Sequence, residues 1–114
     1  MAAQTLEGVI RVDETDELGY YEVYIGDREV AAWSKEVAGG YGQRVKAILM
    51  IEDQVYLEAQ GKLAAWEGDP GYSSWTPGNG PSVDVWEDTK DHDIIQKLER
   101  NEGHNAVLSL EVVE

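Results

Sequence analysis

The chain contains 114 residues, of which 23 are Asp or Glu and nine are Lys or Arg, so its formal net charge at pH 7 is -14. This charge disfavours binding to nucleic acid and anionic membranes, because like charges repel, and it favours cationic partners. The absence of Cys excludes disulfides, thiol catalysis and cysteine metal sites. With 42% hydrophobic residues, the chain is expected to fold as one domain, residues 1–114.

The N-terminal segment lacks the features of a secretion signal. Residues 1–7 have neither a basic start nor an apolar run, and no stretch approaches the length of a membrane span. We therefore expect a cytoplasmic protein that has no membrane partner.

The first third of the chain has the pattern of an antiparallel sheet. Residues 6–12 are predicted to form a strand, and an acidic turn is predicted at residues 13–19. Residues 20–33 then predict two strands joined by a two-residue turn at Gly26 and Asp27. Gly26 supplies the positive φ that the first position of a type II′ turn requires.

The register of this hairpin assigns its side chains to two faces. Val23 is expected to face Val30, and Tyr21 to face Ala32, on the inner side. The other face is expected to carry Tyr20, Glu22, Tyr24, Glu29 and Trp33. Residues 34–42, which include two adjacent glycines, are interpreted as a connector.

The segment from 45 to 66 fits either a helix or a hairpin. As a helix, it would include an acidic residue in its apolar stripe and leave three apolar residues outside it. As a hairpin, residues 45–51 and 55–66 form two strands joined at residues 52–54, and the first is a continuous apolar run. We favour the hairpin. Gly61 then marks a bulge or bend in its second strand.

The second half opens with an irregular segment. Residues 67–81 contain all three prolines and four of the twelve glycines, which predicts a long loop that carries Tyr72 and Trp75. Residues 82–86 alternate between polar and apolar types and are expected to form a strand.

A helix is predicted to begin at Asp88 or Thr89 and to end near Asn101, with Gly103 as its C-terminal cap. Its apolar stripe consists of Ile94, Ile95 and Leu98. Residues 106–113 alternate and predict a last strand. The expected fold class is therefore α+β, mainly an antiparallel β-sheet or small sandwich, with one helix in the C-terminal half and a long loop rich in Gly, Pro and aromatic residues.

The acidic residues are clustered along the chain. Residues 13–27 contain six acids and residues 63–89 contain five, and neither segment contains a base. Carboxylates on one face of a strand recur about every 6.6 Å, which is comparable to the spacing of successive phosphates. We therefore expect the acids to imitate nucleic acid and to bind a basic nucleic-acid-binding protein, without binding nucleic acid directly. The candidate contact residues are Asp13, Glu14, Asp16, Glu17, Asp84, Glu87, Asp88, Asp91 and Asp93, with Tyr72 or Trp75 as hydrophobic anchors.

The alternative interpretation of these acids is structural. Residues 13–17 would form a solvated loop, and Asp88, Asp91 and Asp93 would stabilise the positive N-terminal end of the helix.

No motif indicates a metal, a cofactor or catalysis. The acids after Asp13 lack the glycine and the final glutamate of a calcium loop, since position 24 is Tyr. His92 lies between two aspartates without a second His nearby. The separation between His92 and His104 does not match the spacing of the His ligands in a zinc site. Neither His is placed beside a nucleophile in the sequence. We expect no metal site, no cofactor and no enzymatic activity.

The aromatic residues support a different class of function. Trp66, Tyr72, Trp75 and Trp86 lie in or beside the long loop, and aromatic rings next to carboxylates are typical of β-type carbohydrate-binding modules. The alternative, which we favour, is that Trp66 and Trp86 cover the core while Tyr72 and Trp75 fold the loop back on the sheet.

The segment that runs from Gly68-Asp69-Pro70 to Val85-Trp86 resembles the strand, proline-rich loop and strand of small phage and prophage proteins. In its small size, strong acidity and lack of Cys, the chain also resembles phage-encoded inhibitors of host restriction and CRISPR systems. This resemblance implies an acidic inhibitor that acts by DNA mimicry in the cytoplasm of a host cell, or alternatively a phage structural or assembly component. It assigns no residue roles, and the target and the oligomeric state stay open.

Overall fold

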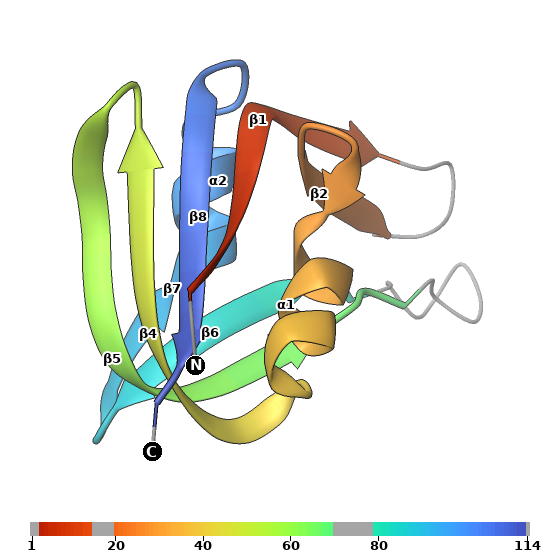
Figure 1. Ribbon diagram of the computed structural model, residues 1–114. Coiled ribbons are helices and arrows are strands. Elements are labelled where there is room, and N and C mark those ends of the chain that lie inside the picture. The colour runs from red at the N-terminus through yellow and green to blue at the C-terminus, as the bar shows by residue number, and fades with distance from the viewer. Residues whose placement is uncertain (1–2, 15–19, 70–78, 114) are drawn as a thin grey trace.

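The structure is a computed structural model that describes residues 3–14, 20–69 and 79–113 (Figure 1). The described residues form eight strands and two helices. In chain order these are β1 (Gln4–Glu14), β2 (Tyr21–Ile25), β3 (Arg28–Glu29), α1 (Val30–Ala38), β4 (Tyr41–Ile51), β5 (Gln54–Trp66), β6 (Ser82–Glu87), β7 (Lys90–Asp93), α2 (Ile94–Glu99) and β8 (Asn105–Val112).

All eight strands belong to one antiparallel sheet with the order β3-β2-β1-β8-β4-β5-β6-β7. Strand β1 joins two parts of this sheet, because its first half pairs with β8 and its second half, from Ile10 to Glu14, pairs with β2. Gly8 lies where β1 changes partner, and a Cβ there would be 2.6 Å from the Cα of Gly26. The β2–β3 turn can therefore pack directly on β1. Figure 1 shows a strongly bent sheet, with α2 behind β8 and β1.

The core lies on one side of this bent sheet. Alternate residues of the strands face it, since side chains of a strand point to opposite faces in turn. The buried strand residues are Leu6, Ile10, Val23, Ile25, Val45, Ala47, Leu49, Ile51, Leu57, Ala59, Leu63, Ala65, Val83, Val85, Ala106, Leu108 and Leu110. The helices add Val30, Ala31, Trp33 and Ala38 from α1 and Ile94, Ile95 and Leu98 from α2.

The predicted fold class is confirmed, as is the hairpin over residues 45–66. Strands β4 and β5 pair from Ile51 and Gln54 outward, across a two-residue turn. Glu52 and Asp53 in this turn have φ values of 50° and 66°, as a type I′ turn requires. The apolar run of residues 47–51 thus lies in a central strand that has β5 on one side and β8 on the other.

Gly61 is not a bulge, contrary to the prediction. The register is regular through the Val45–Gly61 pair, and it shifts instead between Leu49 and Met50 and between Tyr41 and Arg44. A Cβ at Gly61 would lie 2.1 Å from the carbonyl oxygen of Trp86. The glycine is therefore explained by the close approach of β6 and not by an inserted residue.

The turn at Gly26 and Asp27 is present, but the second strand of the predicted hairpin is wrong after Glu29. The φ of Gly26 is 62°, and the predicted register holds for the pairs that follow the turn. Helix α1 then replaces both the strand and the connector, so the Val23–Val30 and Tyr21–Ala32 pairs do not form. Trp33 is consequently buried in α1 instead of sharing the outer face of β2.

The side chain of Glu29 explains where α1 begins. Its carboxylate accepts hydrogen bonds from the backbone N–H groups of Ala31 at 2.8 Å and Ala32 at 3.3 Å. These are two of the donors that the first turn of a helix leaves without a partner. Gly39, with a φ of 78°, ends the helix in the left-handed conformation.

The second helix also begins later than predicted. Asp88 lies in a turn with a φ of 55°, and strand β7 precedes α2. The N-terminal cap is Asp93, whose Oδ1 accepts a hydrogen bond from the N–H of Gln96 at 3.0 Å. The helix ends at Glu99, so Gly103 is not its cap and lies in the turn that follows. The predicted stripe of Ile94, Ile95 and Leu98 is buried as expected.

Candidate binding surface

Five of the predicted contact residues lie on one short hairpin. Strands β6 and β7 and the turn between them carry Asp84, Glu87, Asp88, Asp91 and Asp93. The register pairs Asp84 with Asp93 and Trp86 with Asp91. Since register partners project from the same face of a sheet, these three aspartates surround Trp86 on the outer face.

The three aspartates of this face are crowded. Burial, followed by the hydrogen bond with Asp91 and the charges of Asp91 and Asp93, raises the pKa of Asp84 to about 7. In the part of the chain that the structure describes, no ion pair joins these aspartates to a Lys or Arg. The hairpin therefore holds carboxylates together at a cost in electrostatic free energy.

The remaining residues of the hairpin have different surroundings. Asp88 is exposed in the turn. The carboxylate of Glu87 lies 3.8 Å from Nε2 of His92, a buried atom without a hydrogen-bond partner among the described residues. Asp93 has a second role as the cap of α2, so its position is partly explained by the fold.

The first acidic cluster is only partly described. Asp13 and Glu14 end β1, where they pair with Glu22 and Tyr21 of β2. Asp13 forms an exposed ion pair with Arg11 at 3.3 Å, so it is less available than the sequence suggested. Asp16, Glu17, Tyr72 and Trp75 lie outside the described residues.

The bend of the sheet brings β2 close to α2 and to the start of β6, although four strands separate β2 from β6 in the sheet order. The hydroxyl of Tyr21 donates a hydrogen bond to Glu99 at 2.8 Å, and burial together with Glu99 raises the pKa of Tyr21 to about 12. A Cβ on Gly80 would lie 2.1 Å from the Tyr21 ring. Tyr21, the register partner of Glu14, therefore links the first acidic cluster to helix α2, which follows the β6–β7 hairpin.

An aromatic face on β4, β5 and β6 was not predicted from the sequence. Tyr41 is 85% exposed, Trp66 53% and Trp86 41%, so the expectation that Trp66 and Trp86 cover the core is wrong. The alternation of side chains along β5 could have predicted the exposure of Trp66, since Leu63 and Ala65 occupy the buried face of the strand and Trp66 falls on the other. Exposed aromatic side chains grouped on one face indicate an interaction surface.

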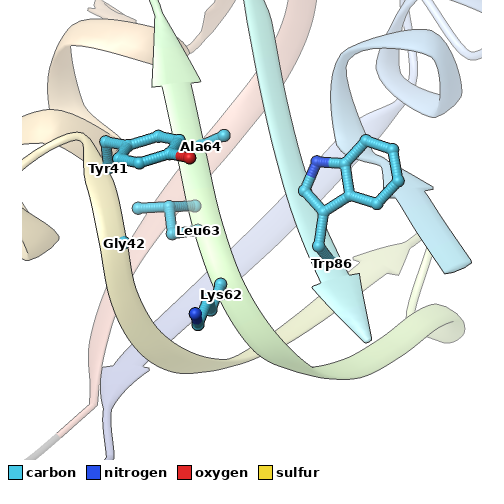
Figure 2. Close-up of a pocket in the computed structure, with 6 residues that line it drawn as sticks. All are labelled: Tyr41, Gly42, Lys62, Leu63, Ala64 and Trp86. Carbon is cyan, nitrogen blue, oxygen red and sulfur yellow. The ribbon is translucent and has the colours of Figure 1, made fainter. Parts of the chain in front are cut away.

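A hollow of about 210 Å³ lies within this face, lined by Tyr41, Gly42, Lys62, Leu63, Ala64 and Trp86. Figure 2 shows Tyr41 and Trp86 on either side of β5, with Lys62 and Ala64 on that strand. Trp86 also lines a second hollow of about 250 Å³, together with Arg44, Gln60, Gly61, Glu87 and Asp88. The acidic hairpin and the aromatic face thus meet at Trp86.

Within the described ranges, no group of three or more His, Asp or Glu side chains is arranged to hold a metal ion. Neither helix of these described residues has the length and apolarity needed to cross a membrane. The chain matches no protein-family model, and comparison with curated proteins and with solved structures found no similar protein.

Proposed function

We propose that this protein is a small acidic binding protein that occupies the basic nucleic-acid-binding groove of a larger protein. The observation that supports this proposal best is the outer face of the β6–β7 hairpin. Asp84, Asp91 and Asp93 lie together there, and none of them has a Lys or Arg ion partner among the described residues.

Crowded carboxylates favour the arrival of a cation. The raised pKa of Asp84 reflects burial and the nearby carboxylates of Asp91 and Asp93, and a Lys or Arg side chain of a partner would relieve that repulsion. The same charges accelerate association with a basic surface through electrostatic steering. Binding to a cationic partner would therefore be favoured by the relief of the electrostatic repulsion within the hairpin.

The geometry also suits mimicry of a phosphate backbone. Register partners across a sheet are about 5 Å apart, and same-face residues along a strand are about 7 Å apart. The hairpin thus presents negative charges in two dimensions at spacings comparable to those of phosphates. Together with small size and a net charge of -14, this favours a phage-type inhibitor of a host defence protein that works in the host cytoplasm.

Competition with DNA tests the proposal. The panel consists of purified restriction endonucleases and CRISPR effector nucleases with fluorescent duplex DNA as the probe, and the wild-type protein should displace the DNA from at least one of them. Changing Asp84, Glu87, Asp88 and Asp91 to Lys should abolish this competition. Changing the same aspartates to Asn and Glu87 to Gln should weaken the competition, because these substitutions remove the negative charges without adding positive ones.

A matched control changes four other exposed acids to Lys, namely Glu7, Asp27, Glu58 and Asp69. It alters the net charge equally, so it should retain most of the competition if the hairpin is the contact. Raising the salt from about 0.05 M to about 0.2 M should weaken the complex steeply, as it does for nucleic acid. Equal competition by the folded hairpin variant and the wild type would refute the proposal, and co-purification with virions without competition would favour a structural component.

A further inference from the structure

The hollow beside Trp86 carries a second inference, which does not rest on the proposed function. A register shift between Tyr41 and Arg44 inserts one extra residue into β4, and Gly42, with a φ of 85°, lies within this shift. The shift makes Tyr41 the register partner of Ala64. A large exposed ring therefore stands beside a small side chain, which leaves the space open.

Ala64 forms the floor of this space and has a different kind of neighbour on each side. Its register partner on β4 is Tyr41, and its register partner on β6 is Asp84. Two residues earlier on β5, Lys62 is the register partner of Trp86. The hollow thus has two aromatic side chains, an ammonium group that can donate hydrogen bonds and a neighbouring carboxyl group that can accept them.

This combination of groups restricts the chemistry of a ligand. An anion would be repelled by the net charge of -14 and by Asp84, whereas a cation would meet Lys62 inside the hollow. A purely apolar ligand would displace water from the ammonium group of Lys62 without replacing its hydrogen bonds. A neutral ring with an apolar C–H face and several hydroxyl groups can pack on the aromatic side chains and form hydrogen bonds with both Lys62 and Asp84.

We infer that the Tyr41–Trp86 hollow binds a neutral pyranose ring of an oligosaccharide, with the C–H face of the sugar against the aromatic rings and its hydroxyl groups on Lys62 and Asp84. The volume of about 210 Å³ is below the roughly 300 Å³ at which pockets for drug-sized ligands begin, so the hollow holds little more than one ring.

Trp66 extends the site along β5. It lies four residues after Lys62 on the same face of the strand, which corresponds to about 13 Å along an extended chain. One sugar ring cannot contact both Trp86 and Trp66, whereas an oligosaccharide can. Longer saccharides should therefore bind more tightly than monosaccharides, and Trp66 should account for the difference.

The test is a titration of the intact ¹⁵N-labelled protein with four neutral hexasaccharides, a β-1,4-glucan, an α-1,4-glucan, a β-1,4-xylan and a β-1,4-mannan. At least one of them should shift the indole N–H signal of Trp86. Trp86→Ala and Tyr41→Ala should each weaken its binding by about tenfold, the loss expected when one aromatic stacking contact is removed. Trp66→Ala should weaken binding of the hexasaccharide and leave binding of the disaccharide unchanged.

Tyr56→Ala is the control, because Tyr56 is also exposed on β5, at 51%, but does not line the hollow. It should leave the affinity unchanged, and so should a rise in salt from about 0.05 M to about 0.5 M, since no net charge is neutralised on binding. The inference is overturned if no hexasaccharide shifts the Trp86 signal, or if binding survives both Trp86→Ala and Tyr41→Ala. Failure of DNA competition alone would affect only the proposed function.

Discussion

The carbonyl oxygen of Trp86 approaches Gly61 so closely that a Cβ on Gly61 would lie only 2.1 Å from it. This contact sets the distance between β5 and β6 at the position where the aromatic face and the acidic hairpin meet. Because the obstructing atom belongs to the backbone, it cannot move away by a change of rotamer. The packing of the candidate binding surface therefore depends on a glycine at position 61.

Gly61→Ala should destabilise the protein by about 3 kcal/mol, the upper part of the range for overpacking a close contact. Gly42→Ala is a suitable comparison, because nothing lies within 4 Å of its added Cβ and its cost arises only from a φ of 85°. That cost should be about 1 kcal/mol. Urea unfolding measures both, and equal losses for the two variants would contradict the steric explanation.

Gly26→Val should destabilise the β2–β3 turn. The φ of Gly26 is 62°, and an added Cβ would also approach the carbonyl oxygen of Glu7 at 3.2 Å. We expect a loss of about 2 kcal/mol, since a β-branched residue is strained at positive φ. Asp27→Asn should be nearly silent in the same thermal or urea unfolding experiment. A large effect of Asp27→Asn would mean that the Asp27 carboxylate, and not the backbone conformation, maintains the turn.

Stability should decrease as the pH rises through neutrality. Burial and the neighbouring carboxylates raise the pKa of Asp84 from 3.8 to about 7, so the folded protein holds this proton more tightly than the unfolded chain. The contribution is fully present below pH 3.8 and is lost as the pH rises through about 7. Asp84→Asn should therefore reduce the loss of stability between pH of about 5.5 and about 8.5.

Urea unfolding at these two pH values tests the role of Asp84. Glu58→Gln is the matched control, because Glu58 is an exposed acid of the neighbouring strand whose register partner is Ile48. It should leave the pH dependence close to that of the wild type. Identical pH profiles for Asp84→Asn and the wild type would show that the folded protein does not raise the pKa of Asp84.

The two roles of Asp93 can be separated by two substitutions. Asp93→Ala removes the cap of α2 and should cost about 1 kcal/mol. Asp93→Asn keeps a side chain that can accept the hydrogen bond from Gln96 and removes a charge near Asp84, so it should be neutral or stabilising at pH 7. If both variants lost the same stability in urea, the charge of Asp93 and not its capping geometry would be what the helix requires.

Monovalent salt should stabilise the folded protein. The Lys and Arg ion pairs among the described residues are Arg11–Asp13, Arg28–Glu36 and Lys35–Glu67, all between well-exposed side chains, and such pairs contribute little. Repulsion among the acids should therefore dominate, and Tm should rise as NaCl increases from about 0.01 M to about 0.2 M. A Tm that falls over this range would mean that the ion pairs outweigh the repulsion.

Much of the sheet could be predicted from local patterns. The alternating strands, the turn at Gly26 and the hairpin over residues 45–66 depend on neighbouring residues alone. Helix α1 was missed because its start depends on Glu29, which is a less common cap than Ser, Thr, Asp or Asn. The start of α2 was misplaced because Asp88 and Thr89 are suitable cap residues by type, whereas the pairing of β7 with β6 keeps the chain extended as far as Asp93, which is the cap.

The sequence by itself determined the acidity of this protein, its antiparallel strands and its main turns, because charge is a matter of composition and these elements follow from short-range sequence periodicity. Only the tertiary structure decided which side chains are neighbours across strands. The crowding of Asp84 with Asp91 and Asp93 depends on the β6–β7 register, and the hollow between Tyr41 and Trp86 depends on one extra residue in β4. A shift of one residue in either register would turn these side chains to the other face. The β6–β7 turn and the extra residue in β4, which set these registers, were not predicted from the sequence.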